Sequence, residues 1–147
     1  MGFSISFLSD EVIFLENDKY LSGTIQLGEF EEGFNAPISY WQAMNYEQQW
    51  KNALHRILSG AKNSCLITSM YKPSLANFII WWPLYRVDDM IVCQNQLLFL
   101  DQLSTGFDEK NPYQSIKPMQ SITPTGDKVS EWEVNIKEVQ DFYERNW

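Results

Sequence analysis

The chain has 147 residues, 44% of them hydrophobic, and its 19 acidic residues against 11 Lys and Arg give a formal net charge of −8. A chain of this length buries about 70% of the surface that its unfolded form exposes, which predicts a single domain over residues 1–147 that needs neither disulfide bonds nor a structural metal to fold. The negative charge works against nucleic-acid binding, because a protein that contacts phosphates needs a basic surface. The charge favours a basic partner instead.

The first half of the chain predicts weak strands followed by one long helix. The segments 4–8, 12–15 and 24–27 have short runs of strand-forming residues. Residues 45–58 carry apolar side chains at three- and four-residue spacing, which predicts an amphipathic helix. We expect Asn45 as its N-cap, with Gln48 completing a capping box, and Gly60 as its C-terminal stop.

The middle of the chain is typical of β-strands. Four segments rich in β-branched and aromatic residues predict strands at 65–71, 77–87, 90–95 and 128–134. Asp88 and Asp89 are expected to close a hairpin between the second and third of them. Pro83 predicts a bulge or an edge near the middle of the second strand, because proline cannot donate a hydrogen bond to the ladder.

A short second helix is expected at the C-terminus, after Asn135. Glu138 follows Asn135 by three residues and repeats the capping pattern. A helix this short is marginal in water, so it must dock on the rest of the fold. The predicted fold class is therefore α+β, with a twisted, mostly antiparallel β-sheet packed against one long helix and one short C-terminal helix.

Residue types that carry catalysis or bind metals are scarce. His55 is the single histidine and lies at the border of the polar face of the long helix, where a solvated or capping side chain is expected. Cys65 and Cys93 can pair only if the fold brings their Cα atoms within about 7 Å. Neither zinc-ligand spacing nor a phosphate-binding glycine loop is present, so no metal and no cofactor are expected.

Two alternative functions stay open at this point. Abundant carboxylates allow a hydrolase that uses a carboxylate pair, although no two of them are singled out by their spacing. Aromatic strand residues such as Trp81 and Trp82 allow a single-stranded nucleic-acid-binding module that stacks bases. Only Lys72 and Arg86 supply positive charge nearby, which favours an aromatic row buried in the core.

The sequence also predicts where the protein resides. Residues 1–8 contain no Lys or Arg and are followed by Asp10 and Glu11, unlike a targeting segment. The longest apolar-rich stretch, 78–84, is far shorter than the about 20 residues that cross a bilayer. We therefore expect a cytoplasmic protein that makes no contact with a membrane.

Acidic residues in connecting segments form a candidate anionic surface. Such a surface steers basic partners and accelerates their association. The candidate binding residues are Glu29, Glu31 and Glu32 in one loop, Asp88 and Asp89 at the hairpin tip, and Asp108 and Glu109 in another connection.

A series of aromatic and turn residues between Ser39 and Tyr143 carries a family resemblance. The runs are Ser39-Tyr40-Trp41, Tyr46, Trp50, Leu54, Ser69-Met70-Tyr71, Asn77-Phe78-Ile79, Trp82, Tyr85, Gln94-Asn95 and Gly126-Asp127-Lys128-Val129-Ser130-Glu131-Trp132. In their order and spacing they resemble the CdiI immunity proteins of bacterial contact-dependent growth inhibition.

The resemblance implies a small cytoplasmic immunity protein that is not an enzyme. Proteins of this family bind the C-terminal toxin domain of a cognate CdiA effector, commonly a nuclease, and we expect a monomer that forms a 1:1 complex. The resemblance also implies a twisted antiparallel sheet similar in shape to Whirly single-stranded-DNA-binding domains, but the charge of −8 argues against DNA binding. An acidic protein can cover the basic cleft of a nuclease, so the expected mechanism is steric and electrostatic blocking at the acidic residues named above.

Overall fold

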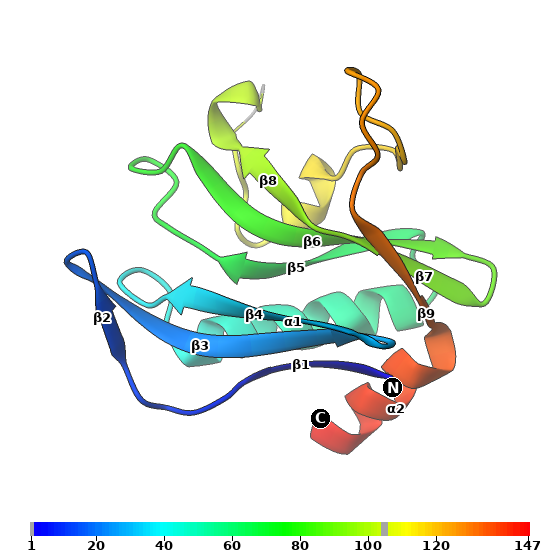
Figure 1. Ribbon diagram of the computed structural model, residues 1–147, viewed down its shortest axis with the longest axis horizontal. Helices are drawn as coiled ribbons and strands as arrows, with labels where there is room; N and C mark the ends of the chain where they lie inside the picture. The colour runs from blue at the N-terminus through cyan, green and yellow to red at the C-terminus, as the bar shows by residue number, and fades with distance from the viewer. Residues whose placement is uncertain (1, 104–105) are drawn as a thin grey trace.

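The computed structural model describes residues 2–103 and 106–147 and has the predicted α+β architecture (Figure 1). Its strands are antiparallel wherever they pair, and two α-helices pack beside them. The elements in chain order are β1 (Phe3–Phe7), β2 (Ile13–Leu15), β3 (Asp18–Leu27), β4 (Phe30–Pro37), α1 (Ala43–Leu58), β5 (Asn63–Ser69), β6 (Phe78–Val87), β7 (Met90–Gln94), β8 (Gln96–Phe99), the 3₁₀ turns η1 (Leu100–Gln102) and η2 (Pro112–Ser115), β9 (Glu131–Asn135) and α2 (Ile136–Asn146).

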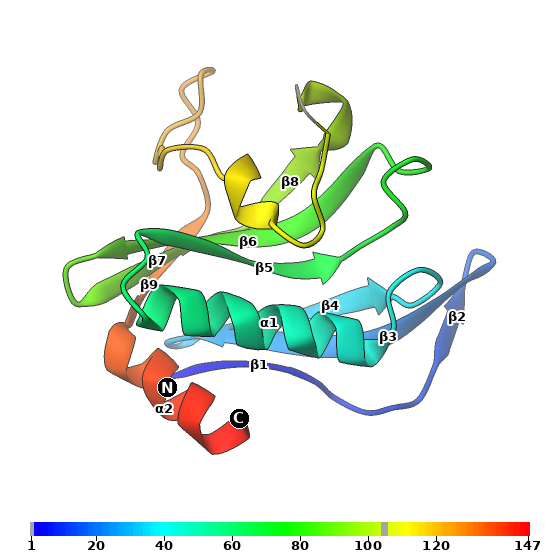
Figure 2. The same ribbon diagram turned by 180° about the vertical axis from the view of Figure 1, so that it is seen from behind.

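The strands divide into two sheets, where the sequence predicted one. In the first sheet β3 is central, with β1 and β2 along one side and β4 along the other. In the second sheet the order is β5-β6-β7-β9, and β8 continues β7 along the same side of β6. Strand β4 was not predicted, and it pairs with β3 alone before the chain enters α1. Figure 2 shows α1 running alongside β5 and the first sheet.

Helix α1 covers the free edge of β5 with polar side chains. The Gln49 Nε2 atom donates to the Cys65 carbonyl at 2.8 Å, and Gln49 Oε1 accepts from the Ile67 N–H at 2.9 Å. The Trp50 Nε1 atom donates to the Ile67 carbonyl at 2.8 Å. An exposed strand edge is a template for unwanted pairing, and these side chains satisfy the edge as a neighbouring strand would.

The helix ends agree with the sequence except at the start of α1. That helix begins at Ala43, and the predicted N-cap Asn45 is wrong: Asn45 is the third helical residue, and its Oδ1 accepts from the N–H of the N-cap Gln42 at 2.8 Å. Gly60 follows the C-cap at a φ of +110°, and the hydrogen bonds around it form a Schellman motif. Asn135 is confirmed as the N-cap of α2, where it accepts from Lys137 N–H.

Pro83 lies where the pairing along one side of β6 is interrupted. On that side β8 pairs with residues Phe78 to Trp81, and β7 pairs with residues Leu84 to Val87. Pro83, which has no backbone N–H to donate, therefore lies between the segments of β6 that pair with β8 and with β7. This fits the predicted irregularity near the middle of the strand. The bulge itself lies in the neighbouring strand β5, between Ile67 and Ser69.

The second sheet is buried on both faces, which explains its aromatic content. Trp82 packs toward β9, with its ring 5.8 Å from that of Trp132. The opposite face is covered by residues 102–103 and 115–117, where the Tyr85 hydroxyl donates to the Lys117 carbonyl at 2.8 Å. Trp81 and Trp82 are 2% and 1% exposed, so the predicted aromatic core is confirmed and these rings are unavailable for stacking on bases.

Both cysteines are free and buried, and we expect them to be unreactive in the folded protein. Cys65 on β5 and Cys93 on β7 flank β6, about 9 to 10 Å apart at ordinary strand spacing, too far for a disulfide. Burial raises the pKa of each thiol.

Iodoacetamide should modify both thiols in guanidinium and neither in native buffer, as read by mass spectrometry. Rapid native alkylation would contradict this expectation.

Candidate functional site

Asp88 and Asp89 form the exposed tip of the β6–β7 hairpin, as predicted. Asp88 has a φ of +54°, a left-handed conformation that Asp tolerates better than most residues. The Asp89 carbonyl accepts from the Ile136 N–H at 2.9 Å, which ties the tip to the start of α2. Glu133 of β9 joins the two aspartates around a shallow groove of about 500 Å³. Glu133 was not among the residues predicted from the sequence, although its place in a strand opposite β7 indicates it.

Glu29, Glu31 and Glu32 do not share one loop, which corrects the sequence prediction. Glu29 lies in the turn between β3 and β4, but Glu31 and Glu32 belong to β4. Because side chains alternate along a strand, Glu31 faces outward, whereas Glu32 faces the second sheet and accepts from Asn95 Nδ2 at 3.1 Å. Glu32 is thus engaged within the fold, and Glu29 and Glu31 remain exposed.

These two sets meet at one end of the molecule. Phe30, beside Glu29, stacks on Trp132 of β9 with ring centroids 4.1 Å apart, and the Asp89 tip joins the other end of the same strand. Both hairpin tips lie on the right in Figure 1, next to β9 and α2. We call this surface the acidic end and define it by Glu29, Glu31, Asp88, Asp89 and Glu133.

Asp108 and Glu109 lie elsewhere, against the N-terminal half of α1. Both carboxylate oxygens of Glu109 are engaged, one by the Tyr40 hydroxyl and the other by Trp41 Nε1 at 3.0 Å. The hydrogen bond to this carboxylate raises the pKa of Tyr40. Asp108 accepts from the Lys110 N–H at 2.9 Å within its own turn. Glu109 therefore connects two segments of the fold, and the structure does not bring it to the acidic end.

The acidic residues form no metal site in the part of the chain that the structure describes. No group of three or more His, Cys, Asp and Glu among residues 2–103 and 106–147 could hold a metal ion. His55 is exposed on α1, with its ring 6.1 Å from that of Tyr143, so it has the solvated setting that its position predicted. The exposed carboxylates at the hairpin tips lie on protruding turns, where water screens their charges.

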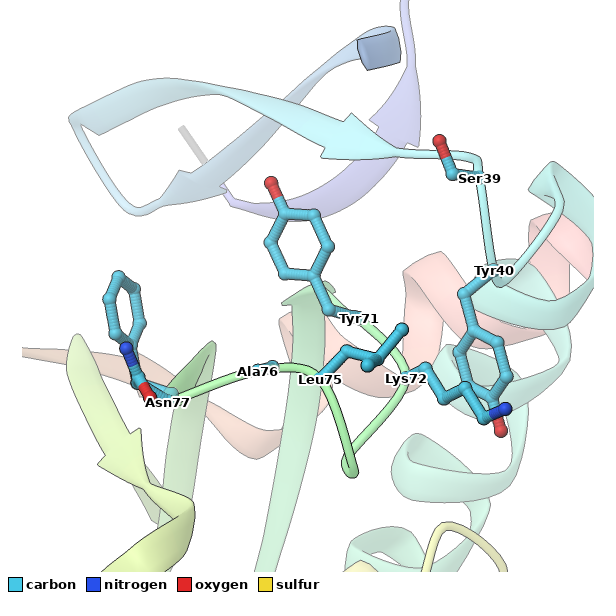
Figure 3. A pocket seen from close by; sticks show the side chains of 8 residues that line it. Ser39, Tyr40, Tyr71, Lys72, Leu75, Ala76 and Asn77 are labelled. Carbon is cyan, nitrogen blue, oxygen red and sulfur yellow. The ribbon is translucent and has the colours of Figure 1, made fainter. Parts of the chain in front are cut away.

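A separate cleft of about 440 Å³ opens between the segment after β4 and the connection from β5 to β6. Figure 3 shows Tyr71 at its centre, between Tyr40 on one side and Asn77 on the other. The Tyr71 hydroxyl lies 3.3 Å from that of Tyr20, and burial raises the Tyr71 pKa. Leu75 is 82% exposed at the rim. Tyr71 was predicted as the last residue of a strand, but β5 ends at Ser69, and no pattern in the sequence indicated this cleft.

Comparisons with known proteins give the family. The model of the CdiI N-terminal domain matches residues 36–142. The chain is 33% identical over 137 residues to "Immunity protein CdiI" of Enterobacter cloacae subsp. cloacae, which covers 93% of this chain and 94% of the relative. The chain belongs to the CdiI family. Its fold also matches a chain from the structure "CdiA-CT/CdiI toxin and immunity complex from Enterobacter cloacae", with a TM-score of 0.88, 32% identity and 97% coverage of both chains.

Membership in the CdiI family confirms several predictions. It agrees with the resemblance seen in the aromatic and turn residues, and it makes this chain an immunity protein and not an enzyme. The TM-score shows that this CdiI chain and its structural relative share the fold over nearly their whole lengths.

None of the helices within residues 2–103 and 106–147 is both long and apolar enough to cross a membrane.

Proposed function

We propose that this CdiI protein binds and neutralises the C-terminal toxin domain of a cognate CdiA effector. The observation that carries the proposal is the match, over 97% of both chains, to an immunity protein solved together with its CdiA toxin domain. The toxin in this proposal is a basic nuclease, and the two proteins form a 1:1 complex in the cytoplasm.

Immunity in this proposal is steric and electrostatic and requires no chemistry from the inhibitor. A nuclease needs a basic cleft to hold phosphates, and a protein with a net charge of −8 is attracted to such a cleft. The acidic end supplies exposed carboxylates from two hairpins and one strand. We assign the main electrostatic contact to Glu29, Glu31, Asp88, Asp89 and Glu133. Glu32, Asp108 and Glu109 contribute to the negative potential at longer range.

The two alternative functions find less support in the geometry. A base-stacking platform needs exposed aromatic rings in a positive groove, whereas Trp81 and Trp82 are buried. A hydrolase of the glycosidase type needs two carboxyl groups about 5 to 9.5 Å apart in a pocket that surrounds the substrate. The exposed carboxylates of the acidic end instead lie on turns and strand faces at the surface.

Co-expression with the C-terminal toxin domain of the cognate CdiA effector tests this proposal. The expected result is restored growth of cells that produce the toxin, together with a 1:1 complex in gel filtration coupled to light scattering. An unrelated acidic protein of similar size serves as the control for nonspecific charge effects. Failure to restore growth, with no complex at low salt, would overturn the proposed function.

A further inference from the structure

The antiparallel ladder between β7 and β9 ends at Gln94, whereas the chain continues beyond β7 as strand β8. The register pairs Met90 with Asn135 and Gln94 with Glu131, and the Asn95 N–H still donates to the Ser130 carbonyl at 3.4 Å. One step further, the same register would place Lys128 opposite Leu97 and Gly126 opposite Phe99. The chain instead leaves the sheet before Ser130, and residues 119–130 form a separate projection that we call the arm. Strand β8 is therefore left beside an unfilled strand position.

The backbone of β8 presents hydrogen-bonding groups to this position. The Leu100 N–H donates to the Asn77 carbonyl at 2.9 Å, so Leu100 and Asn77 form a hydrogen-bonded pair of the antiparallel ladder. Hydrogen-bonded and non-hydrogen-bonded pairs alternate along such a ladder. The N–H and C=O groups of Leu97 and Phe99 therefore point away from β6. Among the described residues, no hydrogen bond outside the helices and strands uses the Leu97 groups or the Phe99 N–H, whereas the Phe99 carbonyl, at the N-cap of η1, accepts the first bond of that turn.

A groove of about 540 Å³ occupies the place of the missing strand. One wall is β8, where Leu97 and Phe99 are 48% and 42% exposed. The other wall is the arm, through residues that include Thr123 and Val129. Figure 1 shows β8 and the arm projecting from the same side of the second sheet. Apolar side chains alternating with free backbone groups are the recognition surface that an extended peptide fits.

The arm is held in its own turn and does not fill the groove. The Thr123 N–H donates to the Asp127 carbonyl at 2.7 Å, and the Gly126 N–H donates to the Thr123 carbonyl at 2.9 Å. Ile122 and Lys128 form a β-bridge within the arm. Because these contacts already satisfy backbone groups of the arm, moving it onto β8 would break several hydrogen bonds to form others.

We propose that an extended segment of the toxin domain adds as a strand to β8, between β8 and the arm. This inference rests on the proposed function, because it takes the CdiA toxin domain as the partner. A second copy of this chain is a poorer occupant, because the arm of each copy lines the groove beside the edge through which the two copies would pair. A projecting segment enters the groove without that obstacle. Asp88, Asp89 and Glu133 of the acidic end belong to the same sheet as β8, so both contacts can form in one complex.

The substitution Phe99→Pro, compared with Phe99→Ala, separates the backbone contact from the side-chain contact. Phe99 has a φ of −81°, close to the value that proline fixes, and its N–H does not bond to β6. Both variants lose the aromatic ring, but only the proline variant loses the N–H that the added strand needs. By titration calorimetry, we expect Phe99→Pro to bind the cognate CdiA toxin domain at least tenfold more weakly than Phe99→Ala. The two variants should have matching circular dichroism spectra and melting temperatures.

Amide hydrogen exchange gives a second measurement that needs no variant. In the complex with the toxin domain, the Leu97 and Phe99 amides should exchange at least tenfold more slowly than in the free protein. If the wild-type chain binds no toxin, the proposed function fails. If it binds but the two Phe99 variants bind alike, or both amides exchange unchanged, the added strand is overturned while the function stands. A dimer of the free wild-type chain that Phe99→Pro dissociates would assign the groove to a second copy instead.

Discussion

Replacing Trp50 by alanine is expected to destabilise the protein by about 3 to 5 kcal/mol, the largest single-residue effect on stability that we predict. Trp50 is 1% exposed, packs within ring-contact distance of Phe7 and Phe34, and bonds the free edge of β5 through Nε1. The substitution opens a cavity between the two sheets and leaves the Ile67 carbonyl without its side-chain donor. Urea denaturation, monitored by the far-UV circular dichroism of the backbone, measures the change in the free energy of unfolding.

Two further variants test the reason for that loss. Trp50→Phe keeps an aromatic ring but removes the donor to Ile67, so we expect a smaller cost of about 1 to 3 kcal/mol. Gln48→Ala, on the exposed face of the same helix, should stay within about 0.5 kcal/mol of the wild type. Equal destabilisation by Trp50→Ala and Gln48→Ala would mean that α1 is not anchored through its buried face.

Reversing the hairpin tip with Asp88→Lys and Asp89→Lys is expected to slow toxin association at least tenfold at low ionic strength. Exposed charges act mainly on the association rate, and the effect should shrink as salt is raised because the Debye length falls to about 8 Å at physiological ionic strength. Stopped-flow mixing with a catalytically inactivated toxin domain measures the rate. The dissociation rate should change less, since the tip is exposed and no buried contact is removed.

A matched control distinguishes the tip from the total charge. Asp10→Lys with Glu11→Lys changes the net charge by the same amount, from −8 to −4, but acts in the connection between β1 and β2. We expect less than a threefold change for this pair. Equal slowing by both pairs would show that the overall charge, and not the acidic end, attracts the toxin. Asp88→Asn with Asp89→Asn keeps the turn geometry and should give an intermediate rate.

Local patterns in the sequence determined the elements that depend on neighbouring residues. The periodicity of residues 45–58 gives α1, Gly60 and Asn135 mark helix ends, and Asp88-Asp89 closes the hairpin, because each of these follows from local backbone geometry and side-chain capping. The order of aromatic and turn residues was enough to indicate the CdiI family. The net charge of −8 is likewise a property of composition alone.

The tertiary structure alone decided how these elements meet and which acidic residues are free. Strand β4 has Gly33 and two glutamates in a weak strand pattern, and it forms because β3 offers a ten-residue partner. Its pairing separates two sheets and turns Glu32 inward, while Tyr40 and Trp41 occupy Glu109. The groove beside β8 depends on where the arm leaves β9, far away in the sequence. Such contacts join residues that no local pattern connects, so only the folded chain shows which carboxylates and which strand edge face a partner.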